Sequence, residues 1–347
     1  MQSKPVLAGL PREELSEHLC SYPPFRSRQI YKWICSGAVS FDEMSNLPVS
    51  LREELKVKFS LLSGEVCSEL SDPDGTVKLG INLEDGAGIE AVILSDGEGR
   101  KTACLSTQAG CAMGCVFCKT GALGLKRNLS AQEIAGQFLH LRRRESEISH
   151  IVIMGMGEPL LNLGELRKAL YFFMDSEGLN ISKRRITIST CGIERGIIDL
   201  AENGPDVRLA LSLTTAHNEL REKLMPVSRE NPLSGIRDAL FLYQKKKERR
   251  VTLEMVLLGG INTGIHEADA VAEFVRPGSP ERLDAIINLI PWNHVEGLEF
   301  EGRPLKAPAS RETADFAAAL ESRGLKVTQR YGKGLKISGA CGQLGRV

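Results

Sequence analysis

The sequence contains the stretch Cys104-Leu-Ser-Thr-Gln-Ala-Gly-Cys111-Ala-Met-Gly-Cys115-Val-Phe-Cys118, from which the rest of the chain is best interpreted. Four of the nine cysteines fall within it, and the last three have the spacing C-x3-C-x2-C. Structural zinc is normally held by four protein ligands in a closed tetrahedron. An iron–sulfur cube held by three cysteines keeps one iron open for an exchangeable ligand. The spacing therefore favours a 4Fe–4S cluster over zinc, with buried structural cysteines as a further alternative.

The composition is typical of a soluble globular protein with one large domain and a small appendage. Of the 347 residues, 42% are hydrophobic and 25% are charged, and 44 basic side chains balance 44 acidic ones. Zero net charge does not by itself indicate a nucleic-acid partner. The basic runs 142–144, 183–185 and 245–250 are more often solvated helix ends than phosphate contacts.

The sequence also predicts a cytoplasmic location. No apolar run approaches the ~20 residues needed to cross a bilayer, so no membrane partner is expected. Residues 1–15 become acidic and helix-forming too early for a secretory signal. An odd number of clustered cysteines indicates metal or redox chemistry in a reducing cytosol rather than a disulfide framework.

Residues 1–65 are predicted to form a small helical accessory domain. Apolar residues recur at helical spacing over 25–36, Gly37 is suited to cap that helix, and another helix is expected over 49–59. This domain is interpreted either as a structural lid or as an RNA-binding module.

Residues 66–100 have a different pattern. Polar and apolar residues alternate over 76–83 and 88–94, and turn-forming residues precede and join these two segments. A small antiparallel β extension is therefore expected between the helical domain and the main domain.

From residue 101 to 347 strands alternate with helices, which predicts a parallel sheet with right-handed crossovers. The strands are expected over 101–106, 149–155, 185–190, 207–213, 251–258 and 284–290. The helices are expected over 130–144, 164–176, 193–203, 231–247 and 266–275, with Ser130 and Asn231 as N-caps. Six units predict an α/β fold with a partial (β/α)6 barrel, whose chemistry lies at the carboxyl ends of the strands. A helix over 310–323 and a strand over 326–330 would bring the tail to the barrel mouth.

Several predicted strands are followed by glycine or polar residues. These are Gly157 and Glu158 after the second strand, Ser189 at the end of the third, Ser212, Leu213 and Thr214 at the end of the fourth, and Asn293 after the sixth. Each alone is more often a turn or capping residue than a ligand. Together, at one end of one barrel, they predict a ligand pocket.

Two further cysteines have unusual positions. Cys104 lies in the first predicted strand, just before the cluster loop, so its sulfur is expected near the cluster. Cys341 lies in a glycine-flanked terminal segment, where burial as a core residue is unusual. An incidental terminal thiol is the alternative for Cys341. Cys20, Cys35, Cys67 and Cys191 are interpreted as structural.

The cysteine spacing, with an aromatic residue before Cys118, resembles that of the radical S-adenosylmethionine (SAM) superfamily. Over nearly the whole chain the sequence also resembles the RlmN/Cfr family of RNA adenine methyltransferases. The motifs that carry this resemblance are Pro24–Ile34, Cys104–Cys111, Met154–Leu160, Leu289–Asn293 and Ala340–Leu344.

The resemblance implies a two-stage reaction. One SAM methylates the Cys341 thiolate, and a second, bound at the open iron, is reductively cleaved to a 5′-deoxyadenosyl radical that takes hydrogen from the new S-methyl group. The methylene radical then adds to an adenine carbon, and Cys104 resolves the crosslink, ending in a Cys104–Cys341 disulfide. An sp2 ring carbon has no lone pair with which to displace a methyl group from SAM, so the cofactor supplies the radical and the protein supplies placement and thiols.

The resemblance also implies the roles of individual residues. The cluster ligands would be Cys111, Cys115 and Cys118, the catalytic residues Cys341, Cys104 and the general base Glu90, and the SAM pocket Gly157, Glu158, Ser189, Ser212, Leu213, Thr214 and Asn293. The chain departs from the family pattern at Thr214, where histidine is usual, and at Gly334–Ile337, where Lys336 stands in a usually acidic run. These departures are compatible with a divergent paralogue that has another target nucleotide.

The expected function is methylation of carbon 2 of an adenine in 23S rRNA, with tRNA as a further candidate substrate. Methylation at carbon 8, as in Cfr, is the first alternative. A radical SAM enzyme acting on a non-RNA substrate is the second, and a non-catalytic ribosome-binding protein with an iron–sulfur cluster is the third. An electron donor such as flavodoxin and a monomeric state are expected.

Overall fold

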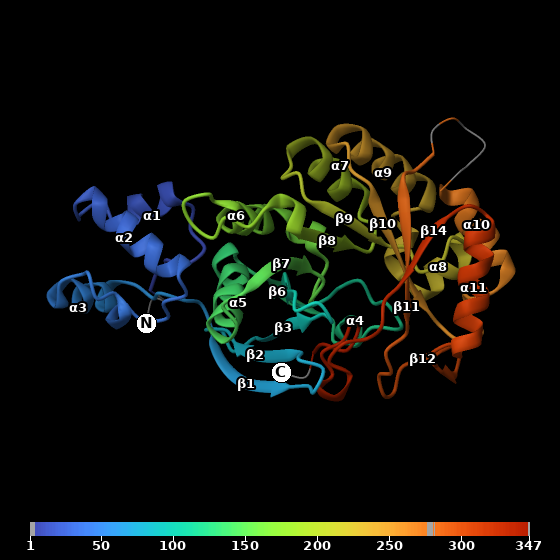
Figure 1. The fold of residues 1–347 in the computed structure, drawn as a ribbon, viewed down its shortest axis with the longest axis horizontal. Coiled ribbons are helices and arrows are strands. Elements are labelled where there is room, and N and C mark those ends of the chain that lie inside the picture. Colours follow the sequence, from blue (N-terminus) through green and yellow to red (C-terminus); the bar gives the residue numbers. More distant parts are fainter. Residues whose placement is uncertain (1–3, 276–279, 281, 346–347) are drawn as a thin grey trace.

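A ten-stranded sheet runs through the structure, a computed structural model that describes residues 4–275, 280 and 282–345 (Figure 1). Its strand order is β1-β2-β3-β4-β7-β8-β9-β10-β11-β14. The strands from β4 onward run parallel, each beside the next. They span Lys101–Cys104 (β4), Ile148–Ile153 (β7), Ile186–Thr190 (β8), Arg208–Ser212 (β9), Val251–Leu257 (β10), Ala285–Pro291 (β11) and Lys326–Gln329 (β14). The predicted α/β fold with six parallel units is confirmed, and β14 extends it by one strand.

Helices connect the parallel strands and surround the curved sheet in Figure 1. They are α5 (Ala131–Arg144), α6 (Leu163–Met174), α7 (Glu194–Asn203), α8 (Asn218–Leu224), α9 (Leu233–Lys247), α10 (Ile265–Val275) and α11 (Ser310–Ser322). Side chains along the strands alternate between the two faces of the sheet. Ile186 and Ile188 of β8 are fully buried, whereas Thr187 between them lines a cavity. Period-two alternation of this kind separates the helix-covered face of a strand from its inner face.

The antiparallel strands β1 (Glu65–Ser71), β2 (Val77–Asn82) and β3 (Gly88–Ser95) form one edge of the same sheet. β3 pairs antiparallel with β4, and Val92 stands opposite Cys104. The β extension expected from the sequence is therefore present, but it continues the barrel sheet directly. This continuity places residues of β2 and β3 beside the carboxyl end of β4.

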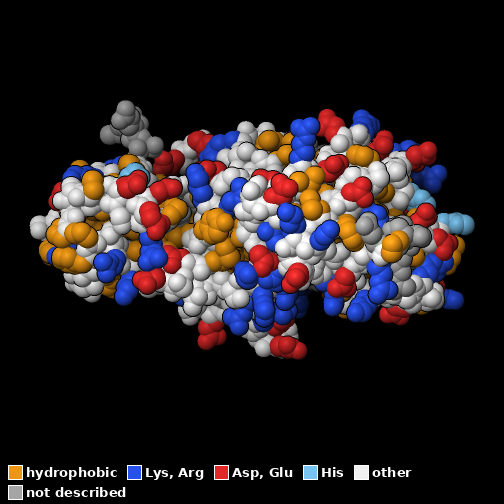
Figure 2. Space-filling view, turned by 90° about the horizontal axis from the view of Figure 1, so that it is seen from above, with side chains coloured by type: hydrophobic (Ala, Val, Ile, Leu, Met, Phe, Trp, Pro, Cys, Tyr) orange, Lys and Arg blue, Asp and Glu red, His pale blue; other side chains and the backbone are white. Residues whose placement is uncertain are grey.

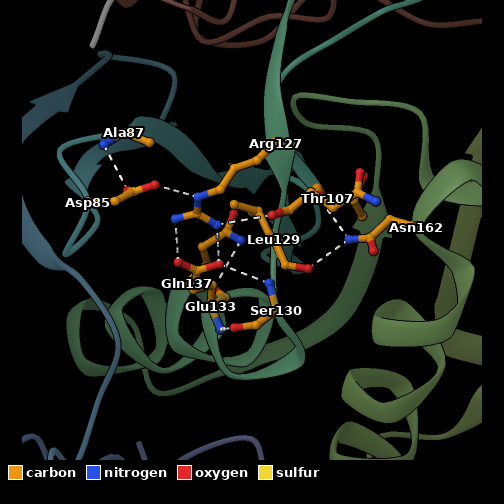
Figure 3. Close-up of polar contacts among 10 residues, drawn as sticks. Asp85, Ala87, Thr107, Arg127, Leu129, Ser130, Glu133, Gln137 and Asn162 are labelled. Atoms are coloured by element: carbon orange, nitrogen blue, oxygen red, sulfur yellow. Dashed lines mark hydrogen bonds and ion pairs between the residues drawn. The ribbon is translucent and has the colours of Figure 1, made fainter. Parts of the chain in front are cut away.

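The turn between β2 and β3 is fixed to the start of α5 by Arg127 (Figure 3). Arg127 donates to both carboxylate oxygens of Glu133, at 2.7 and 2.8 Å, and to Asp85 Oδ2 at 2.5 Å. The Ser130 hydroxyl accepts from Glu133 N at 3.2 Å, and Glu133 Oε2 accepts from Ser130 N at 2.8 Å. This reciprocal capping box confirms Ser130 as the N-cap of α5.

The N-cap prediction for Asn231 is wrong. α9 begins at Leu233, and Asn231 Oδ1 instead accepts a hydrogen bond from Glu194 N at 2.9 Å, while its Nδ2 donates to Val227 O at 3.1 Å. Asn231 thus satisfies a free backbone donor at the start of α7, an earlier helix in the chain.

The helices α1 (Arg12–His18), α2 (Pro24–Cys35) and α3 (Val49–Lys58) lie at one end of the long axis in Figure 1. α2 turns Ile30, Tyr31 and Ile34 into the core. The Tyr31 hydroxyl donates to Asp175 Oδ2 at 2.8 Å, and Arg12 pairs with the same carboxylate at 2.8 Å. Asp175 follows α6, so a buried polar contact joins the N-terminal helices to the barrel.

The basic runs are partly neutralised within the chain. Five of their side chains form ion pairs, which are Arg143–Glu43, Arg144–Glu69, Lys183–Asp206, Arg249–Asp206 and Arg250–Asp284. Figure 2 shows basic and acidic side chains interspersed over the face that it displays, with one gathering of Lys and Arg near the middle of its lower edge. No helix in the described ranges is long and apolar enough to span a bilayer.

Candidate active site

The loop from Cys111 to Cys118 follows β4 and the short hairpin strand β5 (Gln108–Gly110), which pairs with β6 (Leu125–Asn128). Cys111 N donates to Gly124 O at 2.9 Å, and Cys118 N donates to Cys115 O at 3.1 Å. Gly110 has φ +85°, and a Cβ there would lie 2.0 Å from Gly124 O. Only glycine fits at this position, so the backbone fixes how the loop leaves the sheet.

The three thiols of the loop lie against apolar surface. A cluster that includes Leu224 and Trp292 packs against Cys115 and Cys118. Burial raises the pKa of Cys111 to about 11 and raises the pKa of Cys115 far above its ordinary value, with smaller contributions from the neighbouring thiols. Bound iron would reverse this preference, because a metal-bound thiol is deprotonated.

The donor set fits an iron–sulfur cube with three protein ligands. Among the described residues, no three His, Cys, Asp or Glu side chains form a group that could hold a single metal ion. A 4Fe–4S cube offers a separate iron to each thiolate, so its ligands stand further apart than those of one ion. Gly114, with φ +63°, provides the turn between the first two cysteines.

The glycine loop after β7 packs directly on the segment that precedes the cysteine loop. Gly157 has φ +102°, and a Cβ there would lie 2.5 Å from Gln108 Cβ. Glu158 N donates to Gln108 Oε1 at 2.8 Å. Glycine is therefore required for the close approach of these two segments.

Glu158 is 3% exposed, and donors of the chain occupy its carboxylate. Oε1 accepts from the Thr190 hydroxyl at 2.7 Å and from Leu160 N at 3.0 Å, while Oε2 accepts from Cys191 N at 2.8 Å. Burial raises the pKa of Glu158, and these donors oppose that effect. Glu158, assigned to the SAM pocket from the resemblance, thus ties the β7 loop to the end of β8.

Ser189 and Ser212, near the ends of β8 and β9, lie with their hydroxyl oxygens 3.4 Å apart. The Ser189 hydroxyl donates to Glu254 Oε2 at 2.8 Å, and Leu213 N donates to Glu254 O at 2.9 Å. Thr214 has φ +61°, and its buried hydroxyl has no hydrogen-bond partner among the described residues. A polar group buried without a partner is costly, which marks Thr214 as a site for an additional polar contact.

The two thiols outside the loop meet in one interior cavity of about 650 Å³, lined by both Cys104 and Cys341. Burial, with a smaller contribution from the neighbouring Cys341, raises the pKa of Cys104 to about 12. Cys341 lines this cavity with its exposed surface. Burial of the thiol by the surrounding protein raises the pKa of Cys341 as well. All nine cysteines are free thiols.

Hydrogen bonds hold the tail around Cys341 in place. Asn293 Nδ2 donates to Cys341 O at 3.0 Å, Lys119 N donates to Gly342 O at 2.8 Å, and the Thr120 hydroxyl donates to Leu344 O at 2.8 Å. The tail lies beside α4 (Lys119–Ala122) and the β1–β2 edge in Figure 1. Asn293, assigned to the SAM pocket from the resemblance, thus also positions the Cys341 backbone.

Glu90 is buried in contact with the C-terminal tail. Its Oε1 pairs with Lys78 Nζ at 2.8 Å, and its Oε2 accepts from Gly345 N at 2.5 Å. Glu90 is 2% exposed and is absent from the lining of the cavity that holds the two thiols. The residue assigned as general base is therefore in contact with the tail rather than with the open space.

Comparison with known proteins identifies the family. The radical SAM superfamily matches residues 105–275, and the "Ribosomal RNA large subunit methyltransferase N-terminal domain" matches residues 6–61. The chain is 48% identical over 99% of its length to a "Probable dual-specificity RNA methyltransferase RlmN" of Treponema denticola, covering 96% of that protein. It belongs to the RlmN family of RNA methyltransferases.

Other similar proteins support this family assignment. A protein of the same name from Thermus thermophilus is 40% identical over 98% of this chain and 93% of its own length. The crystal structure of a radical SAM methyltransferase from Sphaerobacter thermophilus superimposes with a TM-score of 0.92 at 36% identity, covering 98% of this chain and 99% of that one. The resemblance read from the motifs and the fold class are both confirmed.

Among the charged residues that line the thiol cavity, two that pair with each other were not predicted from the sequence. Glu254 and Arg330 both line it, and Arg330 lies 3.4 Å from Glu254 Oε1. A signal for Glu254 existed, since it is a lone carboxylate in the apolar strand run of residues 251–258. No comparable signal marks Arg330, which follows the last strand.

Proposed function

We propose that this protein methylates carbon 2 of an adenine in 23S rRNA, and also acts on tRNA, through a methylated Cys341. The observation that carries the proposal is the shared cavity of Cys104 and Cys341, which come from opposite ends of the domain. A relay between two thiols requires both sulfurs to reach one substrate atom, and a common cavity allows this. The relatives named as dual-specificity RNA methyltransferases support the choice of RNA.

Cys341 would carry the methyl group. Its thiolate displaces the methyl from one SAM, so that an S–CH₃ bond forms and S-adenosylhomocysteine leaves. Addition of the methylene radical to the ring carbon leaves an unpaired electron, for which the cluster would be the acceptor, and the hydrogen on that carbon would leave as a proton. The Cys104 thiolate then attacks the Cys341 sulfur, so that the disulfide forms as the carbon–sulfur bond breaks. The electron pair of that bond goes to the product carbon, which takes up a proton to become the methyl group. Burial raises the pKa of Cys104, so this thiol must lose its proton before it attacks.

Cys111, Cys115 and Cys118 would hold the cluster. A 4Fe–4S cluster with SAM, when bound, supplies the 5′-deoxyadenosyl radical that removes hydrogen from the S-methyl group. The residues assigned to SAM would bind it where Ser189 and Ser212 meet, next to the unpartnered hydroxyl of Thr214. An electron donor such as flavodoxin would reduce the cluster.

The RNA would approach across the barrel mouth. Tyr331 is 74% exposed and lines both the thiol cavity and a neighbouring groove of about 1000 Å³. An adenine must leave its stack to reach a thiol inside a barrel, and an aromatic ring at the entrance can stack on it. We assign residues 1–65 as an accessory RNA-binding domain, and the protein as a cytoplasmic monomer.

Deletion of the gene tests this proposal. Mass spectrometry of rRNA and tRNA should show that 2-methyladenosine disappears from both and returns with the wild-type gene. If 8-methyladenosine disappeared instead, methylation of adenine by this protein would be supported, but carbon 2 would be the wrong target carbon. If every methyl mark on adenine survived, the proposed function would be wrong.

A further inference from the structure

Arg221 on α8 is the largest side chain in the described residues that is fully buried, with 0% exposure. A buried guanidinium requires acceptors for its donors. Arg221 Nε donates to Leu213 O at 3.1 Å, NH2 donates to Cys191 O at 2.7 Å, and NH1 donates to the Ser228 hydroxyl at 2.5 Å. The guanidinium is therefore rigidly held.

All of these acceptors are neutral. Within the described part of the chain, no Asp or Glu lies within ion-pair distance of Arg221. A buried charge without an opposite charge costs several kcal/mol, and buried arginines are usually paired with carboxylates. Burial lowers the pKa of Arg221, which reflects the same cost. Arg221 thus carries a buried positive charge that is in ion-pair contact with no carboxylate of the described residues.

The helix that carries the Arg221 guanidinium is in contact with the cysteine loop. Val116 N, next to Cys115, donates to Leu224 O at 3.0 Å, and Leu224 ends the short helix that carries Arg221. Leu224, Cys191 and Cys115 belong to one packed apolar group. Arg221 therefore bonds to the backbone of Cys191, which packs with the loop on the same side.

We propose that Arg221 is the counter-charge of the iron–sulfur cluster and raises its reduction potential. This inference rests on the proposed function, since it requires a cluster on Cys111, Cys115 and Cys118. A cube held by three thiolates carries net negative charge, which grows when an electron is added. A fixed positive charge in a dry, apolar surround stabilises the reduced state more than the oxidised one. Arg221 would be a positioning and tuning residue, and it would touch neither SAM nor RNA.

Neutral substitutions separate charge from shape. Arg221→Gln and Arg221→Met remove the charge, Arg221→Lys keeps it, and Arg167→Gln is the matched control. Arg167 on α6 is partly buried and, like Arg221, donates to a backbone carbonyl, Gly204 O at 2.9 Å, but it also pairs with Asp199 at 3.0 Å. Each protein is reconstituted anaerobically without SAM, its iron is measured, and its midpoint potential is determined by EPR-monitored titration.

Both neutral variants should become at least tenfold harder to reduce, which is a fall of about 59 mV for a one-electron couple. Arg221→Lys and Arg167→Gln should keep the wild-type potential. A loaded neutral variant with the wild-type potential would overturn the proposal. So would neutral variants that do not fold as apo-protein by circular dichroism, because Arg221 would then serve the fold. A wild-type protein that binds no cluster would instead contradict the proposed function.

Discussion

Lys78 Nζ lies 2.8 Å from Glu90 Oε1, and the two side chains are 3% and 2% exposed. Lys78 also donates to Ser338 O at 3.2 Å, and Glu90 Oε2 accepts from Gly345 N at 2.5 Å. One buried ion pair, formed between β2 and β3, thus holds the tail on both sides of Cys341. The position of the thiol depends on a part of the sheet outside the barrel.

This contact predicts the effect of Glu90→Gln. The substitution leaves the Lys78 ammonium buried without its partner, which should lower the free energy of unfolding by about 3 kcal/mol. The double variant Lys78→Met/Glu90→Gln removes the unpaired charge, so we expect it to recover most of that stability. The free energy is measured by urea unfolding of the single and double variants.

The single variant separates two roles of Glu90. A glutamine at position 90 can still accept a hydrogen bond from Gly345 N, so if Glu90 only positions the tail, folded Glu90→Gln protein should keep RNA methylation within about tenfold of wild type. If the folded variant has no methylation activity, Glu90 acts as the general base that the resemblance implies. Methylation of Cys341, measured separately, shows whether the first stage is intact.

The three loop cysteines should each be required for iron. Wild-type protein should bind about four iron atoms per chain after anaerobic reconstitution. Cys111→Ala, Cys115→Ala and Cys118→Ala should each lose the cluster, because a missing thiolate leaves one iron without a protein ligand. Cys67→Ala is the matched control, since Cys67 is exposed on β1. Full iron content in any of the three loop variants would rule out the assigned ligand set.

Asp85 should make stability depend on pH in the acid range. Arg127, followed by the Ala87 amide, lowers the pKa of Asp85 to about 2, against ~3.9 in an unfolded chain. A carboxylate with a depressed folded pKa contributes stability above pH ~4 that is lost as the pH falls toward 2. Because its side chain is 47% exposed, the contribution should be only about 0.5 kcal/mol.

Urea unfolding of Asp85→Asn tests this sign. The variant should be less stable than wild type at pH 7, and the difference should vanish near pH 2. Asp238→Asn is the control, because Asp238 is 79% exposed and lies 3.7 Å from its basic neighbour Arg237. A deficit in Asp85→Asn that is the same at both pH values would show that the charge is not its cause.

Asn231→Ala should weaken α7 rather than α9. Loss of the bond to Glu194 N removes a cap, which typically costs about 1 kcal/mol. Hydrogen exchange should accelerate at the Glu194 amide and leave the first turn of α9 unchanged. Asn203→Ala, which removes an exposed contact with Asp199 in the same helix, provides the comparison. Faster exchange confined to α9 would contradict the cap assignment.

Asn231 also shows what the sequence could not predict. Local patterns determined the strand and helix positions well, because period-two and helical spacing are properties of neighbouring residues. Whether Asn231 caps its own helix or another one is decided by tertiary contact. Arg221 and Arg330 belong to no motif, and their importance arises only where separate segments meet. The cysteine loop could be recognised because its three cysteines are close in sequence, whereas the contact of Glu90 with the tail could not be predicted.

The most direct test of the central claim is a mass measurement on the tail peptide that contains Cys341. Protein reconstituted anaerobically with its cluster is incubated with SAM and digested, and Cys341→Ala protein serves as the control. We predict one methyl group on Cys341 in the wild-type peptide and none elsewhere in the chain. An unmodified Cys341, in protein that cleaves SAM under reductant, would contradict the mechanism.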